Sequence, residues 1–238
     1  MIKAPIKLSY IPLVLVVAFC AWIYYPSLTT PGPPLTFKIE GVLDSKLNYR
    51  DAGASINECA HEKLLPEGRL LRSSGFFSGW SCDRVGSPDV IYSLNYSDAE
   101  NRRYYCRGEH GFNVGVTFQH EEFSDIEFLE SWERNPEQVK RVCQFLRDGL
   151  RQFVAGKSSL FHCEAGRDRT GAVIALLAGW EIESKGKLSD AQISAIECDY
   201  RKSKSLKPEK FGRVEGFLRA LASRGGVRIF LAERCGWK

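Results

Sequence analysis

The clearest periodic pattern in the chain is that of an amphipathic helix between residues 135 and 156. Asn135 stands at the N-cap position, Pro136 takes the first helical position, and Gly156 ends the pattern. Apolar residues repeat between these bounds at positions 139, 142, 143, 146, 150, 153 and 154. This spacing predicts a helix that buries one face.

Short runs of β-branched and aromatic residues predict strands on both sides of this helix. Residues 88–96 (PDVIYSLNY) and 112–118 (FNVGVTF) precede it, and residues 158–163 (SSLFHC) follow it as a brief apolar run. The next segment, residues 170–184, is apolar nearly all round. Such a composition is typical of a helix in the centre of a domain.

Two more helices are predicted in the last part of the chain. Ser189 and Gln192 form a capping box ahead of Ile193, and Pro208 opens a segment with apolar residues at helical spacing. The order of strands, helix, strand, loop and helices predicts an α/β domain. We expect a central, mostly parallel sheet flanked by helices, with the active edge at a strand-to-helix turn.

Composition agrees with one globular domain and gives no indication of a nucleic acid partner or a zinc site. The chain has 238 residues, of which 44% are apolar and 26% charged, and its net charge of +4 gives no reason to expect a nucleic acid partner. Its eight cysteines are typical of an oxidising compartment, although scattered core thiols explain them equally well. Because no CxxC spacing occurs, a zinc site is not expected.

The N-terminal region predicts a membrane-directed segment. Residues 10–25 (YIPLVLVVAFCAWIYY) carry no charge and follow two lysines, Lys3 and Lys7. The run is short for a spanning helix, which needs about 20 residues. Bulky residues stand where a signal peptide would need small ones, so we expect an uncleaved transmembrane anchor, with cleavage and secretion as the alternative.

This anchor would place the rest of the chain outside the cytoplasm. The positive-inside rule puts residues 1–9 in the cytoplasm and the domain on the periplasmic or extracellular side. The proline-rich residues 26–37 are expected to form a stiff linker. Residues 38–238 then form the globular domain.

One segment combines a cysteine with the residues of an anion site. In CEAGRDRT, Cys163 is followed by a short loop and a helix start, where free N–H groups and the helix dipole stabilise an anion. Gly166 lets the backbone turn its amides inward, and Arg169 can grip two phosphate oxygens at once. A thiol in a phosphate cradle indicates covalent phosphoryl transfer, with Cys163 as nucleophile.

The neighbouring residues are assigned supporting roles. Thr170 is expected to donate a hydrogen bond to the sulfur. The expected substrate-binding residues of the loop are Glu164, Ala165, Gly166 and Arg167. A buried free thiol is the alternative for Cys163, but apolar burial would not call for three charged residues beside it. Arg50 and Asp51 either support the phosphate loop or form a salt bridge that ties the N-terminal segment to the domain.

The loop carries the Cys-x5-Arg-Thr/Ser signature of the protein tyrosine phosphatase superfamily. Residues 162–171 (HCEAGRDRTG) resemble the HCxAGKDRTG loop of bacterial tyrosine/dual-specificity phosphatases that also hydrolyse phosphoinositides. Residues 48–53 (NYRDAG) are similar to the NFRDxGG element of that branch, residues 68–77 to its G-x-L-x-R-S segment, and residues 198–203 to its DYxxSN element. The elements occur in the family's order between about residues 37 and 221.

This resemblance implies a phosphatase fold and a phosphatase reaction. It implies hydrolysis of phosphotyrosine, with phosphoserine and phosphothreonine as further substrates, through a phosphocysteine intermediate and without a cofactor. The expected partner is a phosphorylated protein. Two departures stand out: Arg167 replaces the usual lysine, and residues 92–95 (YSLN) stand where the family has a DLR strand end.

The resemblance also implies a general acid inside the loop. In the branch that this chain resembles, the aspartate of the phosphate loop is the implicated acid, and Asp168 stands at its place. Most of the superfamily uses an aspartate on a separate loop. Here the corresponding residues 118–128 (FQHEEFSDIEF) contain Asp125, which is the alternative acid.

Other functions remain open at this level. One alternative is a phosphoinositide or inositol phosphate phosphatase, for which Arg167 and a basic segment offer cations: Lys202, Lys204, Lys207 and Lys210. A solvated basic face is the plainer interpretation of the lysines. The second alternative is a non-catalytic phosphate-binding module, or a sulfurtransferase-like protein.

Overall fold

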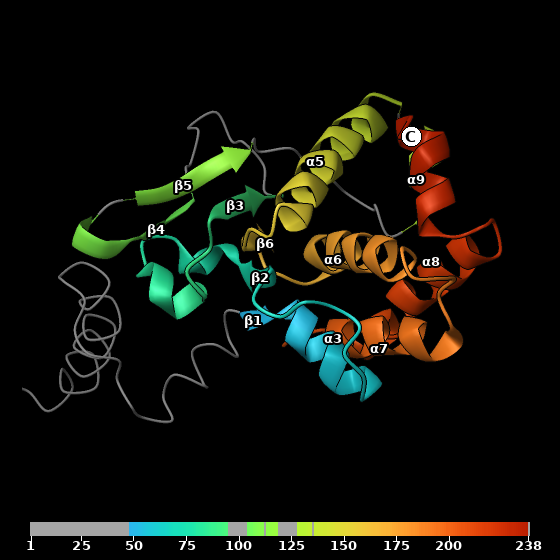
Figure 1. Ribbon diagram of the computed structural model, residues 1–238, viewed down its shortest axis with the longest axis horizontal. Helices are drawn as coiled ribbons and strands as arrows, with labels where there is room; N and C mark the ends of the chain where they lie inside the picture. Colours follow the sequence, from blue (N-terminus) through green and yellow to red (C-terminus); the bar gives the residue numbers. More distant parts are fainter. Residues whose placement is uncertain (1–47, 95–103, 112, 119–127, 135, 238) are drawn as a thin grey trace, which may run out of the picture.

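The computed structural model describes residues 48–94, 104–111, 113–118, 128–134 and 136–237. Its strands are β1 (Arg50–Asp51), β2 (Leu70–Ser74), β3 (Val90–Ser93), β4 (Tyr105–Arg107), β5 (Asn113–Phe118) and β6 (Ser159–Cys163). They form one sheet in the order β1-β2-β6-β3-β5-β4 (Figure 1). The four inner strands run parallel to one another, and β1 and β4 pair antiparallel at the two edges.

Helices make up most of the remaining described chain. The α-helices are α3 (Ala52–Ala60), α4 (Ser131–Arg134), α5 (Pro136–Val154), α6 (Asp168–Ile182), α7 (Asp190–Arg201), α8 (Arg213–Ala222) and α9 (Val227–Cys235). Short 3-10 helices are η2 (Gly75–Phe77), η3 (Cys82–Val85), η4 (Glu109–Gly111) and η5 (Pro208–Lys210). The predicted α/β architecture, with a mostly parallel sheet flanked by helices, is therefore confirmed.

The two faces of the sheet bury different clusters because successive strand side chains point to opposite sides. Tyr92 of β3 and Phe161 of β6 stack in the main core, at a ring separation of 4.7 Å, together with side chains from the long helices. Their neighbours Ile91 and Leu160 face a smaller cluster closed by η2 and η3. Helix α6 lies in the main core with residues 170–179 all buried, which confirms the predicted central helix.

Most of the predicted elements appear at the expected places. Strands β3 and β5 lie within their predicted segments, and α5 begins at the predicted proline; its expected cap, Asn135, lies outside the described residues. The capping box is confirmed: the Ser189 hydroxyl accepts from the Gln192 amide at 3.3 Å, and the Gln192 side chain accepts from the Ser189 amide at 3.0 Å. These elements were predictable because local side-chain patterns specify them.

The helix expected to begin at Pro208 begins later. Pro208 opens only η5, and Gly212, with φ of 82°, separates this turn from α8. The side chain of Glu197 in α7 accepts from the amides of Gly212 at 2.7 Å and Glu215 at 3.0 Å. The start of α8 is thus capped by a carboxylate from another helix, which the local sequence does not reveal.

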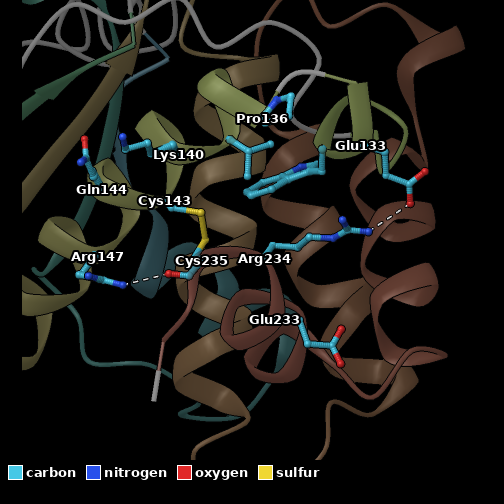
Figure 2. Close-up of a pocket in the computed structure, with 11 residues that line it drawn as sticks. Glu133, Pro136, Lys140, Cys143, Gln144, Arg147, Glu233, Arg234 and Cys235 are labelled. Carbon is cyan, nitrogen blue, oxygen red and sulfur yellow. Dashed lines mark hydrogen bonds and ion pairs between the residues drawn. A yellow bond between two sulfur atoms is a disulfide. The ribbon is translucent and has the colours of Figure 1, made fainter.

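Three disulfides form among the described cysteines. Cys82–Cys106 holds η3 against β4. Cys59–Cys198 joins α3 to α7, and Cys143–Cys235 joins α5 to α9 (Figure 2). Pairing therefore replaces the alternative of scattered core thiols for these six residues, and Cys163 is left as a buried free thiol within the described chain.

The membrane prediction needs correction. Among the helices in the described part of the chain, none combines the length and the apolar character needed to cross a bilayer. This finding contradicts the expected transmembrane anchor, and with it the membrane as a partner and the extracytoplasmic placement that was derived from the anchor. Residues 10–25, the alternative signal segment and the linker 26–37 lie outside the described residues.

Candidate active site

The candidate site lies where the central strand β6 meets the buried helix α6. Cys163 is the last residue of β6 and pairs in register with Ser74 of β2, which brings it to the carboxyl edge of the parallel strands. Its side chain is only 3% exposed. Helix α6 begins at Asp168, so four residues form the connecting loop. The expected strand-to-helix turn is confirmed, and it joins a thiol to a helix N-terminus.

Gly166 has the backbone conformation that this loop requires. Its φ is +65°, in the left-handed region that side chains disfavour. A Cβ at this position would lie 2.5 Å from the carbonyl carbon of Ser73 and 2.6 Å from the amide nitrogen of Ser74. The loop therefore packs directly on the end of β2, and only glycine fits there.

All four carbonyl groups of the loop are held by donors from the surrounding scaffold. The amide of Gly75 donates to the Glu164 carbonyl at 3.1 Å, and the side-chain amide of Asn48 donates to the Ala165 carbonyl at 2.7 Å. One nitrogen of Arg72, Nη2, donates to the last two loop carbonyls: those of Gly166 at 3.0 Å and Arg167 at 3.3 Å. The backbone of the loop is thus held in place through its carbonyl oxygens.

This arrangement turns the loop amides toward the opposite side. In a trans peptide the N–H points away from the preceding C=O, so the N–H groups of residues 165–168 point away from the carbonyl donors. These N–H groups donate to no acceptor that the structure shows among the described residues. Successive free amides at a helix N-terminus form a concave site for an anion.

The strand end that departs from the family pattern supports an arginine of the site. Leu94 follows β3, and its amide donates to the His162 carbonyl at 2.8 Å. Nη1 of Arg169 donates to the Leu94 carbonyl at 2.7 Å. A backbone carbonyl thus orients the guanidinium, and no side chain of residues 92–94 is required for this contact.

Thr170 and Gly171 lie in the first turn of α6. The Thr170 hydroxyl is fully buried and has no hydrogen-bond partner among the described residues, so it can serve a group that enters the site. A Cβ on Gly171 would lie 2.5 Å from the ring of Tyr200 in α7. The start of α6 therefore packs closely against Tyr200.

Asp168 is held by two donors from the C-terminal part of the chain. Its Oδ1 accepts from the Tyr200 hydroxyl at 2.8 Å, and its Oδ2 forms an ion pair with Nζ of Lys210 at 2.7 Å. Burial alone would raise the pKa of Asp168, but the hydrogen bonds from Lys210 and Tyr200 and the charges of Lys210 and Arg167 outweigh it and lower the pKa. The carboxylate is thus stabilised in its ionised form.

The cations offered for a polyanionic substrate are mostly engaged elsewhere. Nη1 of Arg167 donates to the Ser205 carbonyl at 2.6 Å. Lys202 pairs with Glu58 at 2.6 Å, and Lys207 lies 3.8 Å from a carboxylate oxygen of Glu209. With Lys210 bound to Asp168, four of these five cations have acceptors of their own among the described residues.

The residues expected near the N-terminal side of the domain have separate roles. Asp51 caps α3 by accepting from the amide of Ala54 at 3.2 Å, and its other oxygen accepts from the amide of Gly68 at 2.5 Å. Nε of Arg50 pairs with the carboxylate of Asp199 at 2.6 Å. The Arg50 contact is the kind of salt bridge that the sequence left open, whereas Asp51 accepts hydrogen bonds from backbone amides. Asp125, the alternative acid, lies outside the described residues.

Sequence reasoning missed the residues that hold the loop from behind. Asn48, Arg72 and Asp199 lie within the quoted motif segments, but no role was assigned to them. A signal was present for Arg72, since a charged residue directly after two leucines in a buried strand requires a buried partner. Lys210 had no such signal, because its pairing with Asp168 depends on the fold.

Other features of the described surface lie apart from this site. The hollow beside the Cys143–Cys235 disulfide is lined by residues of α4, α5 and α9, and none of residues 163–170 takes part (Figure 2). Among the described residues, no group of three or more His, Cys, Asp and Glu side chains is placed to hold a metal ion.

Comparison with known protein families supports phosphatase activity for this chain. A model described as "Tyrosine phosphatase family" matches residues 117–180, a range that includes the whole loop. Among solved structures, TpbA of P. aeruginosa is similar, with a TM-score of 0.38 and 15% identity over 69% of this chain and 87% of that one. No curated protein matches the sequence. The family match supports the tyrosine phosphatase superfamily and phosphatase activity.

Proposed function

We propose that the protein is a cysteine-dependent phosphatase that hydrolyses phosphotyrosine in proteins, with phosphoserine and phosphothreonine as further substrates. The observation that carries this proposal is the loop after β6. A buried thiol lies there at a helix N-terminus, next to amides that point away from the scaffold donors. The match of residues 117–180 to the tyrosine phosphatase family supports the same conclusion.

The reaction proceeds in two steps. Sγ of Cys163 attacks phosphorus, a sulfur–phosphorus bond forms, and the bond to the leaving oxygen breaks. Water then attacks the phosphocysteine, the sulfur–phosphorus bond breaks, and phosphate leaves. Arg169 and the loop amides stabilise the charge on the phosphoryl oxygens in both steps, and the hydroxyl of Thr170 donates to the sulfur when it leaves.

Proton transfer is assigned to Asp168. Its carboxyl group protonates the leaving oxygen in the first step and accepts a proton from water in the second. The first step requires protonated Asp168, whereas the ion pair with Lys210 favours the ionised form. The enzyme is therefore expected to work best at acidic pH, and kcat/KM is expected to fall as pH rises through the pKa of Asp168.

Removing the charge of Lys210 should move the fall in kcat/KM to higher pH. The ammonium of Lys210 lowers the pKa of Asp168, so the Lys210→Met variant has a higher pKa and keeps the acid protonated over a wider range. The measurement is kcat/KM for p-nitrophenyl phosphate against pH. Lys207→Met is the matched control, because Lys207 pairs with Glu209 and not with Asp168. A descending limb that stays in place, or moves to lower pH, in Lys210→Met would contradict the assignment.

A second comparison distinguishes the two candidate acids. Asp168→Asn is expected to remove the pH dependence of leaving-group protonation, and Asp125→Asn to preserve it. The contrast should be larger for p-nitrophenyl phosphate analogues with poor leaving groups, because these need protonation most. If the profile of Asp168→Asn matches that of the unmodified protein, Asp125 becomes the preferred acid.

The covalent intermediate provides the direct test of the proposed function. Protein denatured rapidly during turnover should carry one phosphoryl group, and peptide mass spectrometry should locate it on Cys163. Turnover without phosphate on this residue would overturn the mechanism. A protein that hydrolyses no phosphate ester, with or without Cys163, would instead be a phosphate-binding module.

A substrate panel tests the finer part of the proposal. Phosphotyrosine, phosphoserine and phosphothreonine peptides are compared with phosphoinositides and soluble inositol phosphates at equal concentration. We expect phosphotyrosine peptides to give the highest kcat/KM, because Arg167 and Lys210 are already engaged with the Ser205 carbonyl and Asp168. A clear preference for phosphoinositides would favour the alternative function.

A further inference from the structure

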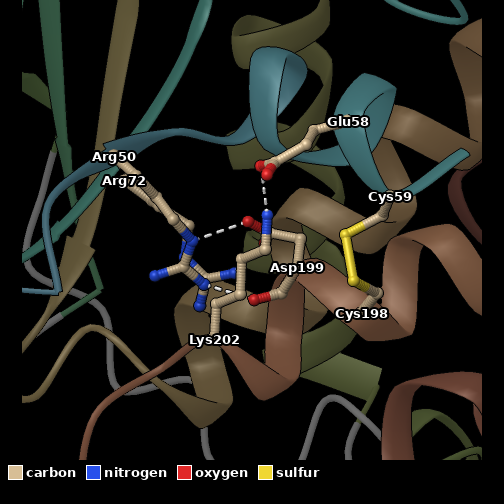
Figure 3. Close-up of a disulfide and its surroundings, with 7 residues drawn as sticks. All are labelled: Arg50, Glu58, Cys59, Arg72, Cys198, Asp199 and Lys202. Carbon is tan, nitrogen blue, oxygen red and sulfur yellow. Dashed lines mark hydrogen bonds and ion pairs between the residues drawn. A yellow bond between two sulfur atoms is a disulfide. The ribbon is translucent and has the colours of Figure 1, made fainter. Parts of the chain in front are cut away.

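A charged pair is buried directly behind the phosphate loop. Arg72 of β2 and Asp199 of α7 are 0% and 1% exposed, and Nη1 of Arg72 donates to a carboxylate oxygen of Asp199. Nε of Arg50 donates to the other carboxylate oxygen at 2.6 Å, and Nη2 of Arg50 donates to the Asp199 backbone carbonyl at 2.5 Å. Figure 3 shows both arginines reaching this one aspartate.

This pair is costly for stability alone. Removing two charges from water carries a large penalty, and a hydrophobic pair of similar volume often serves stability as well or better. Burial and the charge of Arg50 lower the pKa of Arg72 to about 10, against the opposing effect of Asp199, so the guanidinium remains charged at neutral pH. The contacts of Arg72 offer a reason to bury this charge.

Arg72 links the pair to the loop. Its Nη1 is bound to Asp199, while its Nη2 donates to the carbonyls of Gly166 and Arg167. Each of these carbonyls shares a peptide plane with the next N–H, so a fixed carbonyl also fixes an amide that is aimed at the anion. The planar guanidinium can hold two groups at a set angle, which a lysine ammonium cannot.

We propose that Arg72 is a positioning residue that aims the amides of the phosphate loop, and that Asp199 and Arg50 hold its guanidinium in place. The inference rests on the proposed phosphatase function for its catalytic consequence. It assigns no contact with substrate to any of the three residues. Their effect on the reaction passes through the loop backbone.

The Cys59–Cys198 disulfide belongs to the same assembly. Cys198 precedes Asp199, and the bond joins its helix α7 to α3, which starts directly after β1. Lys202 and Glu58 form a further link between the two helices at 2.6 Å (Figure 3). Asp199 is therefore placed against Arg50 and Arg72 by a covalent tie between segments that are 139 residues apart in sequence.

Arg72→Lys tests the geometry at constant charge. In a Cys163→Ser background, calorimetry measures binding of tungstate, an inert oxyanion that resembles phosphate. The lysine keeps the positive charge but cannot bridge Asp199 and two carbonyls, so we expect tungstate to bind roughly tenfold more weakly. With Cys163 present, kcat for p-nitrophenyl phosphate should fall as well, since the same amides stabilise the transition state.

The Asp199→Asn variant distinguishes the positioning effect of Asp199 from the effect of its negative charge on anion binding. Removing a negative charge near the loop would by itself strengthen anion binding. Loss of positioning would weaken it. We expect weaker tungstate binding, by roughly tenfold, because the neutral side chain no longer holds two guanidinium groups by charge-assisted hydrogen bonds. Tighter binding would overturn the inference.

Glu197→Gln is the matched control. Glu197 is also a buried carboxylate of α7, at 3% exposure, but it accepts from the amides that begin α8 and, within the described chain, forms no hydrogen bond with the loop. Its replacement should lower thermal stability without changing tungstate affinity. If Asp199→Asn does not fold, Arg72→Lys decides the question.

The outcomes keep the two proposals apart. In one outcome, hydrolysis depends on Cys163, but the Arg72→Lys and Asp199→Asn variants bind tungstate as tightly as the Glu197→Gln control. This outcome would overturn the positioning role of Arg72 and leave the proposed phosphatase function intact. If tungstate binding weakens in both variants but the protein that retains Cys163 hydrolyses no phosphate ester, the positioning role of Arg72 is supported and the proposed phosphatase function is overturned. If the Cys163→Ser protein binds no tungstate even though Arg72 and Asp199 are unchanged, the positioning role is overturned as well.

Discussion

Replacing Cys163 by serine is expected to lower the hydrolysis of p-nitrophenyl phosphate by roughly 10³-fold or more. In the proposed mechanism the thiol forms the covalent bond to phosphorus, and a serine hydroxyl at the same place lacks its nucleophilicity. Steady-state kinetics measures the loss, and the phosphoryl group trapped on the unmodified protein should disappear.

The Cys163→Ser protein must still bind an oxyanion if the loss of hydrolysis comes from the missing nucleophile. Serine is close to cysteine in size, and the anion is held by amides and Arg169, so tungstate affinity and melting temperature should change little. Substantial remaining activity, or a loss of tungstate binding equal to the loss of turnover, would show that Cys163 is not the nucleophile. The six disulfide cysteines are unchanged in both proteins.

Replacing Gly166 by alanine is expected to lower both oxyanion affinity and kcat/KM, the latter by roughly 10²-fold. Two effects add. Alanine at φ of +65° costs about 1–2 kcal/mol, and its Cβ would lie 2.5 Å from the carbonyl carbon of Ser73, so the loop must move. A shifted loop no longer points its amides at the phosphate. Calorimetry with tungstate and steady-state kinetics measure the two losses.

Gly236→Ala is the control for backbone strain alone. Gly236 ends α9 with φ of +61°, but a Cβ there meets no atom within 4 Å. Its replacement carries a similar conformational cost without a collision, so melting temperature should fall while activity is kept. Equal activity losses in the two variants would mean that general destabilisation, not loop geometry, explains the effect of Gly166→Ala.

The parts of the site that sequence could predict are those specified within one short segment. The run from Cys163 to Thr170 contains the proposed nucleophile, the glycine turn and the proposed phosphate-binding arginine. The apolar segments around it predict the strand and the buried helix. Hydrophobic pattern and backbone permissiveness are local properties, so the strand-to-helix turn was predictable from them.

The partners of these residues were not predictable in the same way. Asp168 was expected to act as an acid on the strength of its place in the loop, but its pKa depends on Lys210, which lies 42 positions away. Arg72 and Asp199 are separated by 127 positions. Electrostatic interactions decay with distance in space, and sequence separation says nothing about that distance.

The sequence by itself determined an α/β domain with a glycine-containing loop between its central strand and a buried helix, because side-chain periodicity and glycine placement act within a few residues. The tertiary structure decided which donors hold the loop carbonyls, which cation pairs with Asp168 and which cysteines join. Those choices depend on distances that exist only once the sheet and helices have packed. Burial then gives them their strength, because charges and hydrogen bonds weigh most where water is excluded.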